Sequence, residues 1–263
     1  SANNKKSFEI SEKLFRKITN TVIKIEPLEA GELIKLFNNT YRDIHFAVGN
    51  IFNEIAQGYG INGNEIIKVS NTGYDRSNIA FPGFVGGPCL EKDAYILTEN
   101  MKDSAGKEFV LNSRKYNESL ESKVVDWIIK NIKPSTRICI SGLAFKGVPE
   151  TSDLRGSNSV NIVKKLNSIG YFPRLHDFAA FKDEVESNLQ GEFSNDLYSS
   201  CKNCEALIIL NNHLKYSKID VGKIINSMDD TKLIILDYWS SLNKISVEMR
   251  NNIVYKNSGN LLI

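Results

Sequence analysis

The sequence predicts an all-helical region over residues 1–134, followed by an α/β domain with a parallel sheet over residues 135–263. Two observations lead to this prediction. In the first half, apolar residues recur every three or four positions over long stretches, which is the pattern of amphipathic helices. In the second half, short apolar runs typical of buried strands alternate with helical patterns, as in parallel sheets whose strands are joined by crossover helices.

Composition limits the classes of function. The chain has 263 residues, and its 33 Lys and Arg nearly balance 31 Asp and Glu, which leaves a net charge of +2. Nucleic acid is therefore not the expected partner, because proteins that track phosphates usually carry a clustered basic excess. No apolar run approaches the roughly 20 residues of a membrane span, so no membrane is expected either. Four Cys in a chain of this length do not make a disulfide framework, which favours a reducing, cytoplasmic location.

Four helices are predicted in the first half. The longest covers 28–58 and exceeds the usual length of a globular helix. We expect it to form a spine, with one face left for the second subunit of a homodimer. The other three are shorter and lie over 63–70, from about residue 89, and over 112–133, where a proline ends the pattern.

The second half is predicted to contain four strands around one clear helix. Each strand is a short and mostly apolar run, as expected of strands that are buried on both faces of a sheet. The strands lie over 137–145, 172–176, 205–210 and 232–237. The helix over 157–169 lies between the first two strands, which indicates a crossover connection and hence a parallel pair.

The segment 81–93, FPGFVGGPCLEKD, leads from a loop of Gly and Pro into a helix that starts near a cysteine. At that helix start, free N–H groups and the helix dipole would stabilise a Cys89 thiolate, or bind an anion such as a pyrophosphate. Asp93 lies four residues later, so its carboxylate can face the same site. A thiol with a carboxylate in reach suits nucleophilic catalysis. The alternative is that Cys89 is a small buried hydrophobe.

Two further groups could contribute charge to a site. Lys35 and Asn39 have i, i+4 spacing on the long helix, where a lysine could act as an acid, a base or an oxyanion stabiliser. Lys146 follows the first predicted strand, and ligands of open α/β sheets bind at the carboxyl ends of strands, so we interpret it as an anion contact. Asp153 and Arg155 end the same loop. Simple solvation is the alternative for each of them.

Three other patterns are not assigned a function. The stretch 58–63, GYGING, matches G-x-G-x-x-G, but it follows a helix where a dinucleotide fingerprint follows a strand, so we assign it to helix termination. Cys201 and Cys204 form a lone C-x-x-C without the partners of a zinc site, so no metal is expected, and a thiol redox role is the alternative. His213 follows a predicted strand and could contact either a ligand or solvent.

Three segments, in this order, resemble the nucleotide-sugar 6-dehydrogenases, the family of UDP-glucose, UDP-N-acetylmannosamine and GDP-mannose dehydrogenases. They are EAGELIKLFNNTYRDIHFAVGNIFNEIA at 29–56, PGFVGGPCLEKD at 82–93 and GLAFKGVPETSDLRGS at 142–157. That family has an N-terminal NAD-binding Rossmann domain, a central helical dimerisation domain and a C-terminal nucleotide-sugar domain of Rossmann-like fold. The resemblance implies that this chain corresponds to the last two, with NAD bound mainly by the first.

The resemblance also implies an activity, the oxidation of the C6 alcohol of a UDP-sugar to a carboxylate with two NAD. Cys89 would attack the C6 aldehyde, and water positioned by Asp93 would hydrolyse the thioester that follows hydride loss. Lys35 and Asn39 would stabilise the charge on the C6 oxygen, and Arg155 would approach the NAD. The implied substrate contacts are Phe81, Pro82, Gly83, Phe84, Gly86, Gly87, Lys146 and Arg76, the last reaching the substrate of a neighbouring subunit.

The substrate can be UDP-glucose or a UDP-N-acetylhexosamine. The interval between Arg76 and Cys89 is shorter than in the UDP-glucose branch of the family, which favours the N-acetylhexosamine branch. Without the NAD domain the chain alone would be inactive. The alternative function is a non-catalytic, dimeric nucleotide-sugar-binding module, which would not need the four residues expected for catalysis.

Overall fold

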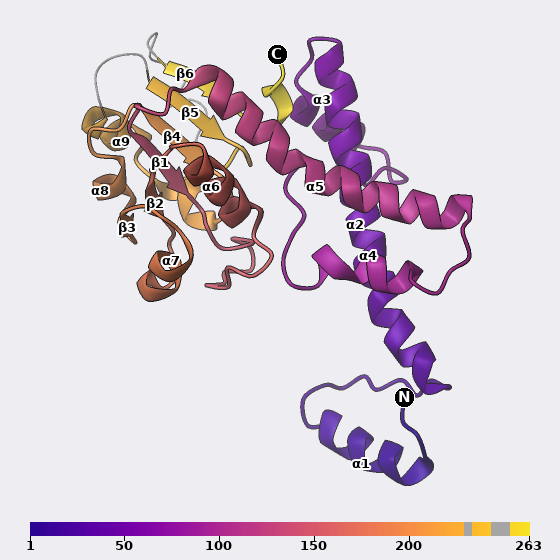
Figure 1. The fold of residues 1–263 in the computed structure, drawn as a ribbon. Coiled ribbons are helices and arrows are strands. Elements are labelled where there is room, and N and C mark those ends of the chain that lie inside the picture. The colour runs from indigo at the N-terminus through magenta and orange to yellow at the C-terminus, as the bar shows by residue number, and fades with distance from the viewer. Residues whose placement is uncertain (229–232, 243–252) are drawn as a thin grey trace.

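The computed structural model describes residues 1–228, 233–242 and 253–263. The helical half contains α1 (Lys5–Phe15), α2 (Leu28–Gly58), α3 (Gly63–Ser70), α4 (Leu90–Thr98) and α5 (Ala105–Asn131). The second half contains β1 (Ile138–Ser141), α6 (Asn158–Ser168), β2 (Arg174–His176), α7 (Lys182–Asn188), β3 (Phe193–Ser194), α8 (Leu197–Cys201), β4 (Ala206–Ile209), η1 (Leu214–Lys218), α9 (Val221–Ser227), β5 (Leu233–Asp237), β6 (Ile253–Lys256) and η2 (Ser258–Asn260). Figure 1 shows the two halves side by side, with α5 running between them.

The described strands form one sheet in the order β3-β2-β1-β4-β5-β6, and every neighbouring pair is parallel. The central strands are apolar throughout because helices cover both of their faces. On β1, Ile138 and Ile140 pack in one cluster with α5 and α6, whereas Cys139 packs in another with α8 and α9. The predicted fold, a helical region followed by a parallel α/β sheet, is confirmed.

Several element boundaries agree with the sequence pattern and others do not. Helices α2 and α3 have the predicted bounds. Helix α5 begins at Ala105 rather than at 112, because the Ser104 side chain caps it by accepting the Lys107 N–H at 3.3 Å. Strand β1 ends at Ser141, before the predicted end, because the next residue, Gly142, turns the chain with φ +88°. The predicted strand over 232–237 is β5, and Lys232 lies outside the described residues.

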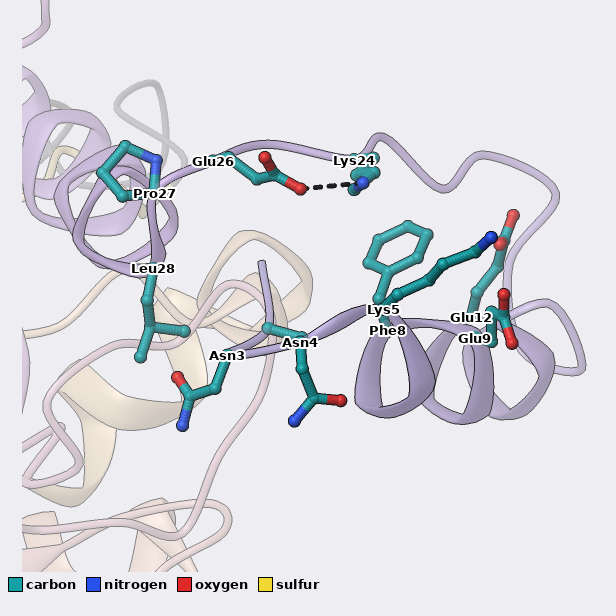
Figure 2. Close-up of a pocket in the computed structure, with 11 residues that line it drawn as sticks. Asn3, Asn4, Lys5, Phe8, Glu9, Glu12, Lys24, Glu26, Pro27 and Leu28 are labelled. Atoms are coloured by element: carbon teal, nitrogen blue, oxygen red, sulfur yellow. Dashed lines mark ion pairs between the residues drawn. The ribbon is translucent and has the colours of Figure 1, made fainter.

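Helix α1 was not predicted, and it lies apart from the rest of the molecule, at the bottom of Figure 1, with none of its residues buried. Together with the segment before α2 it borders an open hollow of about 930 Å³. Figure 2 shows this hollow, where Lys24 pairs with Glu26 at 2.7 Å and lies 5.3 Å from the centre of the Phe8 ring. No residue predicted to act in catalysis or binding lines it.

The two halves share a core through α5. Leu120, Val124 and Ile128 in the second part of this helix belong to the same buried cluster as the strand residues Ile138 and Ile140. The domain boundary expected near residue 135 therefore follows a helix that packs on both halves, and it stays a prediction.

The C-terminal segment joins the halves a second time. The Ser258 carbonyl accepts hydrogen bonds from Asn53 at 2.8 Å and from Gln57 at 3.1 Å, both on α2. The Gln57 side chain in turn accepts the Leu262 N–H at 2.7 Å. These contacts and α5 fix the orientation of the sheet relative to α2.

A third contact between the two halves involves Gly87, in the loop before α4. Its N–H donates to the Gly156 carbonyl of the sheet half at 2.8 Å. Its φ is +92°, and a Cβ atom there would lie 2.6 Å from the Phe145 ring. Only glycine fits this position without strain.

We predict that Gly87→Ala lowers the free energy of unfolding by about 1–3 kcal/mol, because alanine meets both the positive φ and the Phe145 ring. The matched control is Gly58→Ala at the end of α2, where nothing lies within 4 Å of the added Cβ. There we expect no loss, or a gain of up to about 1 kcal/mol. Urea unfolding followed by circular dichroism measures the free energy of unfolding of both variants. Equal losses in the two would contradict the role of Gly87 in joining the halves.

A buried polar chain links β1, β2 and η1. The Ser141 hydroxyl lies 2.7 Å from Nδ1 of His176 and 2.6 Å from the Tyr216 hydroxyl. The His176 side chain is completely buried, and its Nε2 atom has no hydrogen-bond partner among the described residues. Burial lowers the pKa of His176 to about 4.

This shift predicts an acid-sensitive fold. The unfolded chain binds the proton at the ordinary histidine pKa of about 6.5, whereas folded His176 binds it only near 4, so acid favours unfolding. Between pH 7.5 and pH 5 the free energy of unfolding should fall by about 2 kcal/mol on account of this group. Urea unfolding at pH 7.5 and at pH 5 measures this fall in the free energy of unfolding, which should be smaller in His176→Gln. The same fall in the variant as in the wild type would refute the role of His176.

Candidate active site

Most of the predicted site residues meet in one cleft of about 450 Å³ between the two halves. Its walls include Lys35, Asn39 and Arg42 from α2, Cys89 from the loop before α4, and Lys146 and Trp239 from the sheet half. The sheet contributes the segments that follow the carboxyl ends of β1, β4 and β5. The cleft therefore lies at the edge of the sheet where open α/β folds bind ligands.

Cys89 is the N-cap residue of α4. Its carbonyl accepts the N–H groups of Lys92 at 3.2 Å and Asp93 at 3.0 Å, which form the first turn of the helix. Its thiol is free and partly exposed in the cleft, whereas Cys139, Cys201 and Cys204 are fully buried. The cysteine thus lies at a helix N-terminus, where backbone N–H groups and the helix dipole favour negative charge.

Asp93 lies behind Asn39 rather than in the wall of the cleft, and it is 1% exposed. One carboxylate oxygen accepts from the Asn39 amide at 2.7 Å, and the other from Lys92 at 2.8 Å. Burial alone would raise the pKa of this carboxyl. The bonds from Lys92 and Asn39, with the charges of Lys92 and Lys35, outweigh burial and lower the pKa. Asp93 is therefore ionised, and its carboxylate is hydrogen-bonded to Asn39.

The cleft is positively charged. Its walls carry Lys35, Arg42 and Lys146, and its described lining residues include no Asp or Glu. Arg42 and Lys146 form no ion pair with a carboxylate in the described part of the chain, and the Lys146 ammonium lies 5.1 Å from the centre of the Phe145 ring. Such a surface favours an anionic ligand that presents several acceptor oxygens.

The glycines of the 81–89 loop pack against protein. A Cβ atom on Gly83 would lie 2.1 Å from the Trp239 ring, and one on Gly86 would lie 2.4 Å from the Gly156 carbonyl. Asn50 on α2 binds Gly83 at both backbone groups, accepting its N–H at 2.9 Å and donating to its carbonyl at 3.1 Å. The absence of a Cβ at Gly83 and Gly86 thus lets the sheet half approach the loop closely.

Besides Asp93, four predicted site residues lie outside the lining of the cleft. Pro82 and Gly83 are buried beneath it, and Arg76 is exposed in the loop between α3 and α4. Arg155 pairs with Asp153 at 2.7 Å on the outer side of the turn before α6. Arg42 and Trp239 in the cleft wall, and Asn50 behind the loop, were not predicted, since nothing in their immediate sequence neighbours marks them. The i, i+7 spacing of Lys35 and Arg42 on one helix was the available signal.

The patterns without assigned function do not line the cleft, although His213 directly follows the lining residues Asn211 and Asn212. Gly60 follows α2 with φ +72°, so the assignment of 58–63 to helix termination is confirmed. His213 is buried and bonds to Glu150 at 2.5 Å. Cys201 and Cys204 are buried as well, and burial raises the pKa of Cys204 to about 11, which is opposite to what a redox thiol needs.

The described residues contain neither a metal-binding cluster nor a membrane-spanning helix. No group of three or more His, Cys, Asp or Glu among them is arranged to hold a metal ion. None of the helices that the structure describes combines the length and the apolar character needed to cross a bilayer.

Both halves of the chain that border the cleft match models of known protein domains. Residues 29–119 match the model of the UDP-glucose/GDP-mannose dehydrogenase family, central domain, and residues 139–244 match the UDP binding domain of the same family. The UDP-N-acetyl-D-mannosamine dehydrogenase of Methanocaldococcus jannaschii is 31% identical over 91% of this chain and 54% of its own length. That of Pyrococcus horikoshii is 30% identical over 85% of this chain and 51% of its own length.

Solved structures agree with these matches. The structure of the UDP-D-ManNAc dehydrogenase from Pyrococcus horikoshii has a TM-score of 0.78 and 27% identity, covering 98% of this chain and 58% of that protein. The UDP-N-acetyl-mannosamine dehydrogenase Cap5O from Staphylococcus aureus has a TM-score of 0.77 and 25% identity, with the same coverage. The chain spans about half the length of the curated relatives it matches. Since two models of one family match it in order on either side of the cleft, the chain belongs to the UDP-glucose/GDP-mannose dehydrogenase family.

Proposed function

We propose that this chain is the central and UDP-binding part of an NAD-dependent UDP-sugar 6-dehydrogenase of the UDP-N-acetylmannosamine type. The observation that carries the proposal is the cationic cleft in which Cys89 starts a helix beside Lys35 and Asn39, with ionised Asp93 behind them. A site that only bound a nucleotide-sugar would not need a thiol there. The curated relatives described above, which are UDP-N-acetyl-D-mannosamine dehydrogenases, support the sugar class.

In the proposed reaction the Cys89 sulfur adds to the C6 aldehyde to give a thiohemiacetal, and loss of a hydride from C6 to the acceptor, with loss of the hydroxyl proton, gives a thioester. Water then hydrolyses the thioester, which releases the carboxylate and frees the thiol. Lys35, exposed in the cleft, stabilises the negative charge on the C6 oxygen and can exchange a proton with it. Asn39 donates to Asp93 at 2.7 Å and so links the group at C6 to the carboxylate. Asp93, ionised at neutral pH but separated from the cleft by Asn39, acts through the Asn39 amide, which it orients toward the hydrolytic water.

The hydride acceptor is proposed to be bound mainly outside this chain, because the sheet does not offer a dinucleotide site. In the turn after β1, the N–H groups of Leu143 and Ala144 donate to the Asp177 carboxylate at 2.7 and 2.9 Å. These amides are therefore not available to bind a pyrophosphate. When bound, NAD would accept the hydride in each of the two oxidation steps. We expect this chain alone to bind a nucleotide-sugar without oxidising it. Arg155, whose side chain is 75% exposed, is the proposed contact to NAD.

The nucleotide diphosphate is proposed to bind along the cations of the cleft. Lys146 approaches it from the sheet half and Arg42 from α2, so the anion would bridge the two halves. Phe81 and the glycine loop would border the sugar, and Arg76 would reach the site of a neighbouring subunit. The four cysteines are free, which supports action in a reducing compartment such as the cytoplasm.

The test is NADH formation by the whole product of the gene with UDP-N-acetylmannosamine, and with UDP-glucose, UDP-N-acetylglucosamine and UDP-N-acetylgalactosamine. We expect turnover with an N-acetylhexosamine, which Cys89→Ser reduces to background because the oxygen nucleophile does not form the thioester. Lys35→Ala should lower kcat by about 10²–10³-fold. The matched control is Cys204→Ser, which removes a buried thiol remote from the cleft and should keep kcat. Absence of NADH with all four sugars would overturn the proposal.

A homodimer through α2 is the proposed assembly. This helix leaves an apolar stripe uncovered along its length, formed by Ile34, Phe37, Tyr41, Phe52, Ile55 and Tyr59. The residues Phe37 and Phe52 are 56% and 45% exposed. A row of large apolar side chains on a helix of 31 residues is typical of a subunit interface.

We expect a dimeric mass by light scattering at micromolar concentration. Phe52→Asp should yield a monomer because it places a charge in the centre of the apolar stripe. Phe172→Asp, at a phenylalanine that is 68% exposed on the sheet half, is the matched control and should stay dimeric. A monomeric wild-type protein would contradict this assembly.

A further inference from the structure

Arg114, on α5, is among the largest fully buried residues in the described part of the chain, and the proposed chemistry does not use it. Its guanidinium Nη1 donates to Asp43 Oδ1 on α2 at 2.9 Å and to the Leu90 carbonyl at 3.2 Å. Its Nη2 donates to the Val85 carbonyl at 2.9 Å. The two carbonyls lie on either side of Cys89 in the chain, so one guanidinium holds both ends of the segment that carries the thiol.

The same network reaches the loop at a third point. Asn117, also on α5, donates to the carboxylate and the carbonyl of Asp43, both at 2.9 Å, and accepts from Asn50 at 3.1 Å. Asn50 binds Gly83 at both of its backbone groups. The loop is therefore fixed at its beginning by Asn50 and on both sides of Cys89 by Arg114.

We propose that Arg114 is a positioning residue for catalysis, which sets the place of the Cys89 thiol relative to Lys35 and Asn39 by holding the carbonyls of Val85 and Leu90. This role rests on the proposed function, because it matters for turnover only if Cys89 is the nucleophile. Its structural part, a loop held by Arg114, holds independently of that function.

The chemistry of the guanidinium explains why an arginine is used. A planar fork with five donors can serve a carboxylate and two carbonyls at once, whereas a lysine ammonium acts as one compact charge and cannot match the three directions. The Val85 carbonyl is buried and the Leu90 carbonyl is partly buried, and a buried acceptor without a partner is costly. Loss of the fork should therefore release the loop while α2 and α5 stay paired through other contacts, such as Lys123 to Glu54 at 2.6 Å.

The experiment uses two variants. Arg114→Lys keeps a positive charge opposite Asp43 but loses the planar set of N–H donors that reaches the two carbonyls. The double variant Asp43→Asn, Arg114→Gln removes both buried charges together, which avoids an uncompensated charge and keeps the test available if the single variant does not fold. The control is Lys123→Met, which breaks the other ion pair between α2 and α5 and does not touch the loop.

Two measurements distinguish positioning from general stability. Hydrogen exchange of the chain, followed by mass spectrometry, should show at least about tenfold faster exchange at residues 83–90 in both Arg114 variants and not in Lys123→Met. In the whole gene product, kcat should fall by about 10- to 100-fold, with KM for the UDP-sugar within about threefold of wild type.

Unchanged exchange at 83–90, or kcat within about twofold of wild type in both Arg114 variants, would overturn the positioning role. Equal exchange increases in Lys123→Met would overturn it too, since they would reflect general loosening of the helices. An inactive wild-type enzyme would refute the proposed function, and the exchange measurement would then decide the structural part by itself.

Discussion

The buried ion pair between Asp43 and Arg114 is the interaction on which the geometry of the cleft depends. Each residue is 1% exposed, so either charge would be costly without the other. Burial raises the pKa of Asp43, and the Arg114 charge and the Asn117 bond act in the opposite direction. The pair joins α2 to α5, and the remaining donors of Arg114 extend that joint to the loop that carries Cys89. One charge pair is thus connected by hydrogen bonds to the backbone on both sides of Cys89.

The cleft exists because the two halves are rigidly joined around it. Helix α5 buries apolar residues in the core of the sheet half, and the C-terminal segment returns to α2 through Ser258 and Gln57. The glycines of the loop let the backbone of one half touch the other directly at Gly156 and Trp239. Side chains from both halves consequently face a common space, and α2 can present Lys35 and Asn39 to a ligand that the sheet half also contacts.

The sequence was sufficient for features that depend on local pattern, and insufficient for those that depend on distant contacts. The period of apolar residues fixes the bounds of α2 and α3, and the Gly- and Pro-rich loop predicts that Cys89 starts a helix. Arg114 could not be found in this way, because its partner Asp43 lies 71 residues away and both look like ordinary helix-surface charges. Similarly, Asp93 has the predicted spacing from Cys89, but only the fold shows that Asn39 separates it from the cleft.

The occupied turn after β1 changes the kind of recognition that this sheet can offer. Where backbone amides cradle a phosphate, the donors are identical in every sequence and cannot be exchanged by mutation. Here the Asp177 carboxylate accepts those amides, so the groups left to attract an anion are side-chain cations such as Arg42 and Lys146 in the cleft, whose attraction weakens as salt screens it. Specificity built from side chains can be altered one codon at a time, so this architecture can acquire new ligands without any change in its backbone.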